Sequence, residues 1–259
     1  MPKLQNSKIP TGGKKTEGKE KEDVWDTIDK MSTGSNNQPT DENGFSQLST
    51  NFYVSKIGKG EKLEKVEVIF VTENPHVIEI HTVSKEIKSK KGTFSIYPSF
   101  ACQKSSQKTC ILCDEAKTNS AIGAKKSGIF WGVIDTRGEK TKDGFSGEPY
   151  PKFFSMPKAV ALQIKEIKST LAETDTQLNS VVCLVYKTLD GNTHVELKTT
   201  PKRNAKGISQ EIEVIDSIVE FDSSGYPISM ESDIYTGALP NFVSLWSPLS
   251  DEELIAELA

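Results

Sequence analysis

The chain has 259 residues, with 32 Lys and Arg against 36 Asp and Glu and a formal net charge of −4. This length suits one large domain or one domain with long tails. No apolar run approaches the roughly 20 residues that cross a bilayer as a helix, so we expect no membrane partner. No hydrophobic leader is present, which predicts an intracellular, non-secreted protein.

The charge is unevenly distributed along the chain. All Lys and Arg lie at or before Lys206, so residues 1–206 carry a formal +7 and residues 207–259 carry −11. This split suggests a polyanion-binding body followed by an acidic C-terminal arm, residues 207–259. The simpler alternative is that an acidic end only keeps a protein soluble.

The N-terminal segment, residues 1–48, is rich in Lys, Gly, Ser, Asn, Thr and Glu and poor in large apolar side chains. Such a segment cannot bury enough apolar surface to offset its ordering entropy, so it is predicted to be mostly disordered. Within it, Trp25, Ile28 and Met31 recur at helical spacing and predict a short docking helix.

Strands dominate the centre of the chain. Runs of β-branched and aromatic residues predict strands at 66–71, 77–83, 92–100 and 129–135. After Ser155-Met156-Pro157, a plausible helix start, an apolar stripe predicts an amphipathic helix. The stripe consists of Val160, Ile164, Ile167 and Leu171.

A hairpin is predicted beyond this helix, because Asp190-Gly191 separates the β-rich runs 181–188 and 193–200. Several strands, one helix and a closing hairpin predict a mainly β (α+β) fold. The expected architecture is an OB-fold-like, partly open five-stranded barrel over residues 49–206.

Three cysteines, Cys102, Cys110 and Cys113, are spaced C-x7-C-x2-C, and His81 lies upstream on a predicted strand. Three thiolates and one imidazole would complete a tetrahedral zinc shell. We favour this over a disulfide, because disulfides rarely persist inside cells. A shell closed by four protein ligands leaves no position for water, so the pattern predicts one structural Zn²⁺ in the loop 102–113.

Three histidines are candidates for the fourth ligand. His81 is favoured over His76 because it lies within a β-rich run that would pair with the strand leading to Cys102, and His194 is the least favoured. Cys183, in Val-Val-Cys-Leu-Val, is predicted to be a buried core thiol.

Catalysis has little support in the sequence. There is no G-x-x-x-x-G-K-[ST], G-x-G-x-x-G or H-E-x-x-H motif, and the expected metal shell is closed. We therefore predict a protein that is not an enzyme.

Nucleic-acid binding has more support, because aromatic and basic residues interleave around the predicted zinc loop and its flanking strands. Bases stack on aromatic rings for ~1–3 kcal/mol each, while lysines follow the phosphates. Alternatively, about half of these rings fill the barrel, and strand alternation lets only one of Phe130 and Trp131 face outward. The candidate residues are Phe94, Tyr97, Lys125, Lys126, Phe130, Trp131, Phe153, Tyr186, Lys187, Lys198, Lys202 and Arg203.

Three segments resemble the zinc-containing single-stranded DNA-binding proteins of tailed bacteriophages. They are Cys-Ile-Leu-Cys-Asp at 110–114, Lys-Lys-Ser-Gly-Ile-Phe-Trp-Gly-Val-Ile-Asp at 125–135, and Phe-Phe-Ser-Met-Pro-Lys at 153–158. The hairpin ending at Lys202 is also similar. The resemblance spans residues 66–206, in element order more than in identities. It implies an OB-fold with an inserted zinc loop, a basic cleft lined by aromatic residues, and an acidic C-terminal arm.

The tail departs from a plain acidic run, because residues 250–259 predict a capped helix. Our hypothesis is a protein that coats single-stranded DNA with little sequence preference in replication, recombination or repair. Its arm would recruit replication or recombination proteins, in the host cytoplasm if a phage encodes it. The rival is a zinc-stabilised scaffold that recruits partners through the acidic helix.

Overall fold

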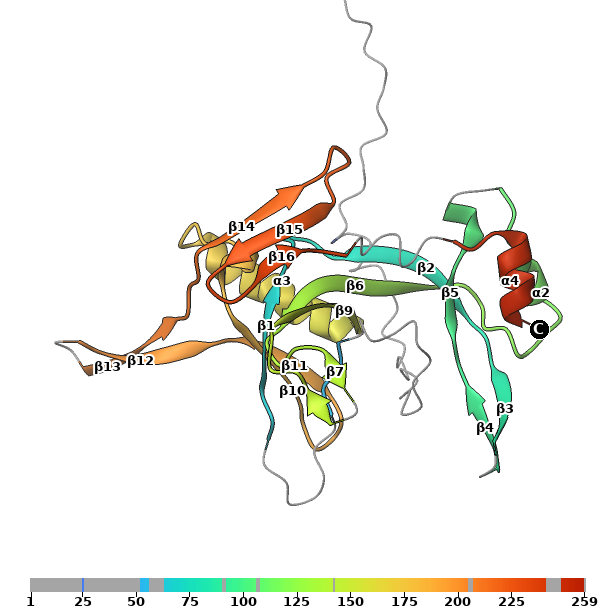
Figure 1. Ribbon diagram of the computed structural model, residues 1–259, viewed down its shortest axis with the longest axis horizontal. Helices are drawn as coiled ribbons and strands as arrows, with labels where there is room; N and C mark the ends of the chain where they lie inside the picture. Colours follow the sequence, from blue (N-terminus) through green and yellow to red (C-terminus); the bar gives the residue numbers. More distant parts are fainter. Residues whose placement is uncertain are drawn as a thin grey trace, which may run out of the picture.

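The computed structural model describes residues 25, 52–55, 63–89, 92–105, 108–141, 143–204, 207–240 and 248–258. Within these residues the protein is mainly β, with antiparallel sheets and few, short helices (Figure 1). Of the N-terminal segment 1–48 only Trp25 is described, and it is helical and buried. The predicted disorder, and the positions of Ile28 and Met31, lie outside the described residues.

The central sheet has seven strands, and the β-branched and aromatic runs noted above form most of them. Its order is β11-β10-β1-β6-β2-β5, with β9 on the other side of β6, and every pair is antiparallel. The path ends at β11 and β5, so the described residues contain no closed barrel. The strands are β1 (Val66–Phe70), β2 (His76–Thr82), β5 (Ser99–Ala101), β6 (Lys126–Asp135), β9 (Tyr150–Met156), β10 (Cys183–Lys187) and β11 (Thr193–Leu197).

Both faces of the long strand β6 are buried. Trp131 points into a core lined by helix α3 (Lys158–Ala172), while Phe130 points into a second core on the opposite face. The second core is completed by Met230 and Leu239 from the C-terminal part of the chain. The prediction that one of the neighbours Phe130 and Trp131 faces outward is therefore wrong, because a layer covers each side of the sheet.

The predicted helix and hairpin are confirmed. In α3, Val160, Ile164 and Leu171 are buried and Ile167 packs against the same core. The helix follows Pro157, which has extended backbone and occupies the N-cap, so Ser155 belongs to β9 instead. The turn between β10 and β11 contains Gly191 with φ +85, a conformation in which a Cβ would be strained.

Two further hairpins lie at opposite ends of the molecule in Figure 1. One is formed by β3 (Lys85–Ser89) and β4 (Gly92–Ile96), beside the cysteine loop, and the other by β12 (Thr199–Asn204) and β13 (Gly207–Ile212). The run 92–100, expected as one strand, is broken into β4 and β5 at Tyr97-Pro98, since proline lacks the N–H that a strand needs. A two-residue pair, β7 (Lys140–Thr141) and β8 (Gly144–Phe145), forms a small ribbon.

Residues 207–240 contain folded strands. β13 pairs with β12 across residue 206, where the sequence suggested a boundary. A three-stranded sheet follows, formed by β14 (Ser217–Phe221), β15 (Pro227–Ser232) and β16 (Thr236–Ala238). This sheet buries Met230 against the central sheet, so the strands belong to the body of the protein.

The chain ends in the predicted helix, α4 (Asp251–Leu258). Its capping box is present, because the Glu253 carboxylate accepts from the Ser250 N–H at 2.8 Å and Ser250 Oγ accepts from the Glu253 N–H at 3.2 Å. In the part of the chain that the structure describes, no helix has the length and apolar character to cross a bilayer.

Candidate metal centre

Four side chains from three segments converge beside the end of the central sheet. His81 lies on β2, paired with Phe100 of β5, and Cys102 follows β5 directly. Cys110 immediately precedes α2 (Ile111–Glu115), and Cys113 lies within it. A turn of 3-10 helix, η1 (Gln103–Ser105), follows Cys102. The sheet thus positions the histidine and one thiol, and a short helix presents the C-x2-C pair.

The ligand atoms are spaced as a tetrahedral site requires. The distance is 3.3 Å from Cys113 Sγ to His81 Nε2, 3.8 Å from Cys110 Sγ to the same nitrogen, and 3.7 Å from Cys102 Sγ to Cys113 Sγ. All four atoms lie within 4.8 Å of one another. Zn–S bonds of about 2.3 Å and Zn–N bonds of about 2.0 Å give tetrahedral edges of about 3.8 Å (S···S) and about 3.5 Å (S···N). The residues therefore fit a metal ion such as zinc.

The orientation of His81 is set by a hydrogen bond on its other nitrogen. Nδ1 lies 3.0 Å from the carbonyl oxygen of Gly123, and this contact requires the proton to sit on Nδ1. Nε2 is then left with a lone pair directed at the cysteines, the arrangement found in metal-binding histidines. Gly123 is held in turn by its N–H bond of 2.7 Å to the Thr82 carbonyl, so β2 carries both the ligand and its support.

The thiols compete with one another for ionisation. Burial raises the pKa of Cys113 to about 11, helped by hydrogen bonds with Cys102 and Cys110. Burial also disfavours the Cys110 thiolate, but hydrogen bonds from the backbone N–H groups of Cys113 and Gln103 and from the Cys102 and Cys113 thiols together outweigh it and hold the Cys110 pKa below its ordinary value. Three thiolates this close need a cation to coexist, which a bound divalent metal would supply.

The cluster is enclosed. His81, Cys102 and Cys110 are buried and Cys113 is half-buried, packed among Val83, Leu112, Ile122 and Leu254. None of the four cysteines forms a disulfide. A site with four protein ligands and an apolar wall suits a structural ion better than a catalytic one.

The other candidate ligands lie elsewhere. His76 begins β2 and its ring is 6.3 Å from that of Tyr226, while His194 stacks on Tyr186 with 5.5 Å between ring centroids. Cys183 is fully buried in β10, and burial raises its pKa to about 12, as expected for an inert core thiol.

Three of the predicted base-stacking residues are core residues. Phe130, Trp131 and Phe153 are each at most 1% exposed. Phe130 and Phe153 stack on each other at 5.0 Å, and Trp131 Nε1 donates to the Thr72 carbonyl at 2.8 Å. A ring enclosed in this way has no face for a base, so these assignments are corrected.

The remaining candidates separate into two groups. Tyr97, Lys125 and Lys126 lie in what we call the metal lobe, residues 81–126, which also contains Phe94 of β4, whose side chain is outside the described residues. The others lie on the β10–β11 hairpin, in the lower centre of Figure 1, and on or just before the β12–β13 hairpin at its left end: Tyr186, Lys187, Lys198, Lys202 and Arg203. The structure therefore does not gather all of them into one cleft.

Ion pairs distinguish the candidate cations further. Lys198 contacts the carboxylates of Glu67 and Glu213 at 2.8 and 2.9 Å, and Lys202 contacts Glu211 at 2.7 Å. Lys125 contacts Glu79 at 2.6 Å, whereas Lys126 is exposed at the start of β6. The hairpin lysines are thus partly neutralised by acids of residues 207–259.

The metal lobe holds most of the positive charge of the body. Residues 81–126 contain nine lysines and three acids, a formal +6 of the +7 in residues 1–206. Tyr97 is 46% exposed in this lobe, next to β5. The lobe therefore combines cations with an accessible ring.

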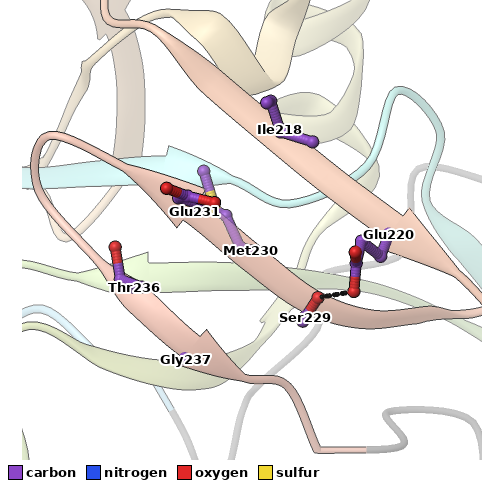
Figure 2. A pocket seen from close by; sticks show the side chains of 7 residues that line it. All are labelled: Ile218, Glu220, Ser229, Met230, Glu231, Thr236 and Gly237. Atoms are coloured by element: carbon purple, nitrogen blue, oxygen red, sulfur yellow. Dashed lines mark hydrogen bonds between the residues drawn. The ribbon is translucent and has the colours of Figure 1, made fainter.

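A small surface hollow of about 200 Å³ lies on the β14–β16 sheet, away from these cations (Figure 2). Its lining includes Glu220, which accepts a 2.6 Å hydrogen bond from Ser229, and Glu231. No lysine or arginine lines it, so it would repel phosphate and is no candidate for nucleic acid.

Two features of the molecule were not found from the sequence. One is Gln103, a buried amide that joins the cysteine loop to α4. The other is a buried ion cluster in which Lys152 contacts Asp135 at 2.7 Å and Arg137 contacts the same carboxylate at 3.0 Å. In the sequence, Gln103 is simply a polar residue next to a cysteine, and Lys152 and Asp135 are charged residues within β-rich runs. Both patterns are common on exposed surfaces, so neither indicates a buried contact.

Comparison with known proteins finds no matching family model, no similar curated protein and no similar solved structure.

Proposed function

We propose that this protein binds single-stranded DNA without catalysing a reaction, through the metal lobe, and that one structural zinc stabilises that lobe. The observation that carries the proposal is the concentration of nine lysines in the sequence of residues 81–126, the same segment that contains the exposed ring of Tyr97. Cations that follow phosphates and a ring on which a base stacks are the two requirements of sequence-tolerant single-strand binding.

The sequence resemblance to zinc-containing single-stranded DNA-binding proteins of tailed bacteriophages supports the same proposal. In this view the antiparallel strands are an OB-fold-like, partly open barrel with the zinc loop inserted between β5 and β6. The protein would coat single strands during replication, recombination or repair.

Zinc would be held by Cys102, Cys110, Cys113 and His81 Nε2. When bound, it would neutralise the thiolates and fix the loop that carries Lys104 and Lys108. The chain's own residues do the rest: His81 is oriented by Gly123, and the apolar wall around the sulfurs excludes water.

Residues 207–259 have a second role in the proposal, the recruitment of replication or recombination proteins through α4. The rival function, a zinc-stabilised scaffold that does not bind DNA, rests on the same helix. It is favoured by one observation, the capped and acidic character of helix α4.

The test is a fluorescence anisotropy titration of a labelled single-stranded oligonucleotide at two salt concentrations. The variant Lys125→Ala/Lys126→Ala is compared with Lys187→Ala/Lys202→Ala, which removes two lysines outside the metal lobe, one on β10 and one on β12. The first should weaken binding to all sequences and reduce the salt slope by about 1.4, because each single-strand phosphate contact contributes about 0.7. The second should retain the affinity and slope of the wild type.

If the Lys187/Lys202 variant alone loses affinity, the binding surface lies on the hairpins instead of the metal lobe. If the unmodified protein shows no salt-sensitive binding, the scaffold function replaces DNA binding.

A further inference from the structure

Helix α4 is docked on the metal lobe, although more than 130 residues separate it from the cysteines in the sequence. Leu254 is 1% exposed and lies in one cluster with Cys102, Cys110 and Leu112, and Leu249 packs against the same cluster. Figure 1 shows α4 lying beside α2 at the end of the molecule that carries the cysteine loop. The apolar wall of the metal centre is therefore completed by the C-terminal helix.

Gln103 connects the helix to the ligands. Its Nε2 donates to the carbonyl of Leu249 at 3.0 Å and to Asp251 Oδ1 at 2.7 Å, while its Oε1 accepts from the Ile111 N–H at 3.0 Å. Its backbone also hydrogen-bonds the Cys110 thiol. Gln103 thus contacts a candidate ligand through its backbone, and through its side-chain amide it contacts the start of α2 and the start of α4.

Charge favours the same arrangement. Asp251, Glu252, Glu253 and Glu257 give α4 a formal −4 without any cation, and the lobe beneath it carries +6. Opposite net charges on the two segments favour their association.

Neither partner is expected to be stable without the other. An isolated helix of eight residues is far below the length at which helices persist in water, and α2 has only five. The metal loop obtains its stability from ligand bonds, because metal-binding free energy is folding free energy in small sites. Two marginal segments that share a buried surface will form and separate together.

We propose that α4 is a latch on the metal lobe, and that its docking and metal binding stabilise each other, so that loss of the metal releases residues 248–258. This coupling is independent of DNA binding and depends only on the metal site. Coupling free energy is reciprocal: if docking of α4 strengthens metal binding by some factor, metal binding strengthens docking of α4 by the same factor. Release would expose the apolar side chains of Leu249 and Leu254.

The first test measures zinc transfer from the loaded protein to a coloured chelator. Leu254→Asp places a charge in the buried cluster, and its matched control, Ile255→Asp, places the same charge at a neighbouring position that is 58% exposed. Leu254→Asp should release zinc at least about 5-fold faster, the lower end of typical couplings. Ile255→Asp should stay within about 2-fold of the wild type.

A second variant covers the case in which Leu254→Asp does not fold. Gln103→Glu retains the acceptor for the Ile111 N–H but loses both donors to α4 and faces Asp251 with like charge, so it should also release zinc faster. Equal release rates for Gln103→Glu, Leu254→Asp and wild type would overturn the proposal.

The reciprocal test is hydrogen exchange of the α4 amides in the unmodified protein with zinc and after chelation. Protection of α4 should fall on chelation, while the amides of α3 remain protected and report that the body stays folded. Unchanged protection of α4 after complete zinc removal would refute the coupling. A purified protein that binds no zinc under any condition would instead refute the metal site itself.

Discussion

Trp131 and Tyr97 give a direct test of the division between core and binding surface. Trp131 is fully buried, lies 5.1 Å from the Phe70 ring, and donates its indole N–H to the Thr72 carbonyl. Trp131→Ala should lower the free energy of unfolding by about 3–5 kcal/mol, because removal of a buried aromatic side chain leaves a cavity. The carbonyl left unpaired at Thr72 places the expected value in the upper part of that range.

The matched substitution is Tyr97→Ala, since Tyr97 is 46% exposed. It should change stability by less than about 0.5 kcal/mol, while weakening single-strand binding by about 1–3 kcal/mol through loss of a stacking platform. Urea unfolding gives the stability of both variants, and anisotropy titration well below each unfolding midpoint gives their affinities. A Trp131→Ala protein with an unchanged midpoint and reduced affinity would show that the ring serves DNA and that our account of β6 is wrong.

Three further predictions concern the rest of the body. Asp135→Asn should destabilise the protein by about 3–5 kcal/mol in urea unfolding, because it leaves the buried Lys152 without its counter-charge. Asp114→Asn, in an exposed pair with Lys117, should leave the unfolding midpoint nearly unchanged, and equal shifts for the two variants would refute the distinction. After chelation, a thiol reagent should modify three cysteines of the folded protein, as counted by mass spectrometry. The fourth, Cys183, should react only after denaturation, because burial raises the pKa of that thiol to about 12. Labelling of Cys183 in the folded protein would contradict this prediction. Trp25→Ala should lower the unfolding midpoint, because the Trp25 ring is buried with its centroid 6.0 Å from that of Trp131, and its N–H donates to Asn74 Oδ1 at 3.1 Å. An unchanged midpoint would mean that Trp25 does not anchor the N-terminal segment there.

Local patterns in the sequence were sufficient for the metal centre and for several elements. The C-x2-C pair and its third cysteine indicate a metal because ligand chemistry restricts both residue type and spacing. His81 could be chosen over His76 and His194 because strand pairing would place it next to the segment leading to Cys102, and the register of β2 with β5 does so. Helix α3 and the turn at Gly191 follow equally local rules of periodicity and backbone conformation.

The strands of residues 207–240 were not predicted, because their acids made the segment resemble a solvated arm. Alternation along β14 and β15 leaves those acids on the outer face, while Met230 faces inward. Once this sheet covers the second face of β6, both Phe130 and Trp131 are buried. Periodicity tells which residues share a face, but it does not tell whether another layer covers that face.

By itself, then, the sequence determined the four candidate ligands, the main helix, the hairpin turn and the separation of charge, since each depends on residues close together in the chain, on simple strand pairing or on counts. Tertiary structure alone decided which aromatic rings lie in the core, where the candidate cations gather, and that Gln103 joins the cysteine loop to α4. These depend on contacts between segments up to 148 residues apart, as between Gln103 and Asp251. Such contacts are selected by the burial and hydrogen bonding of the whole chain, which no local pattern records.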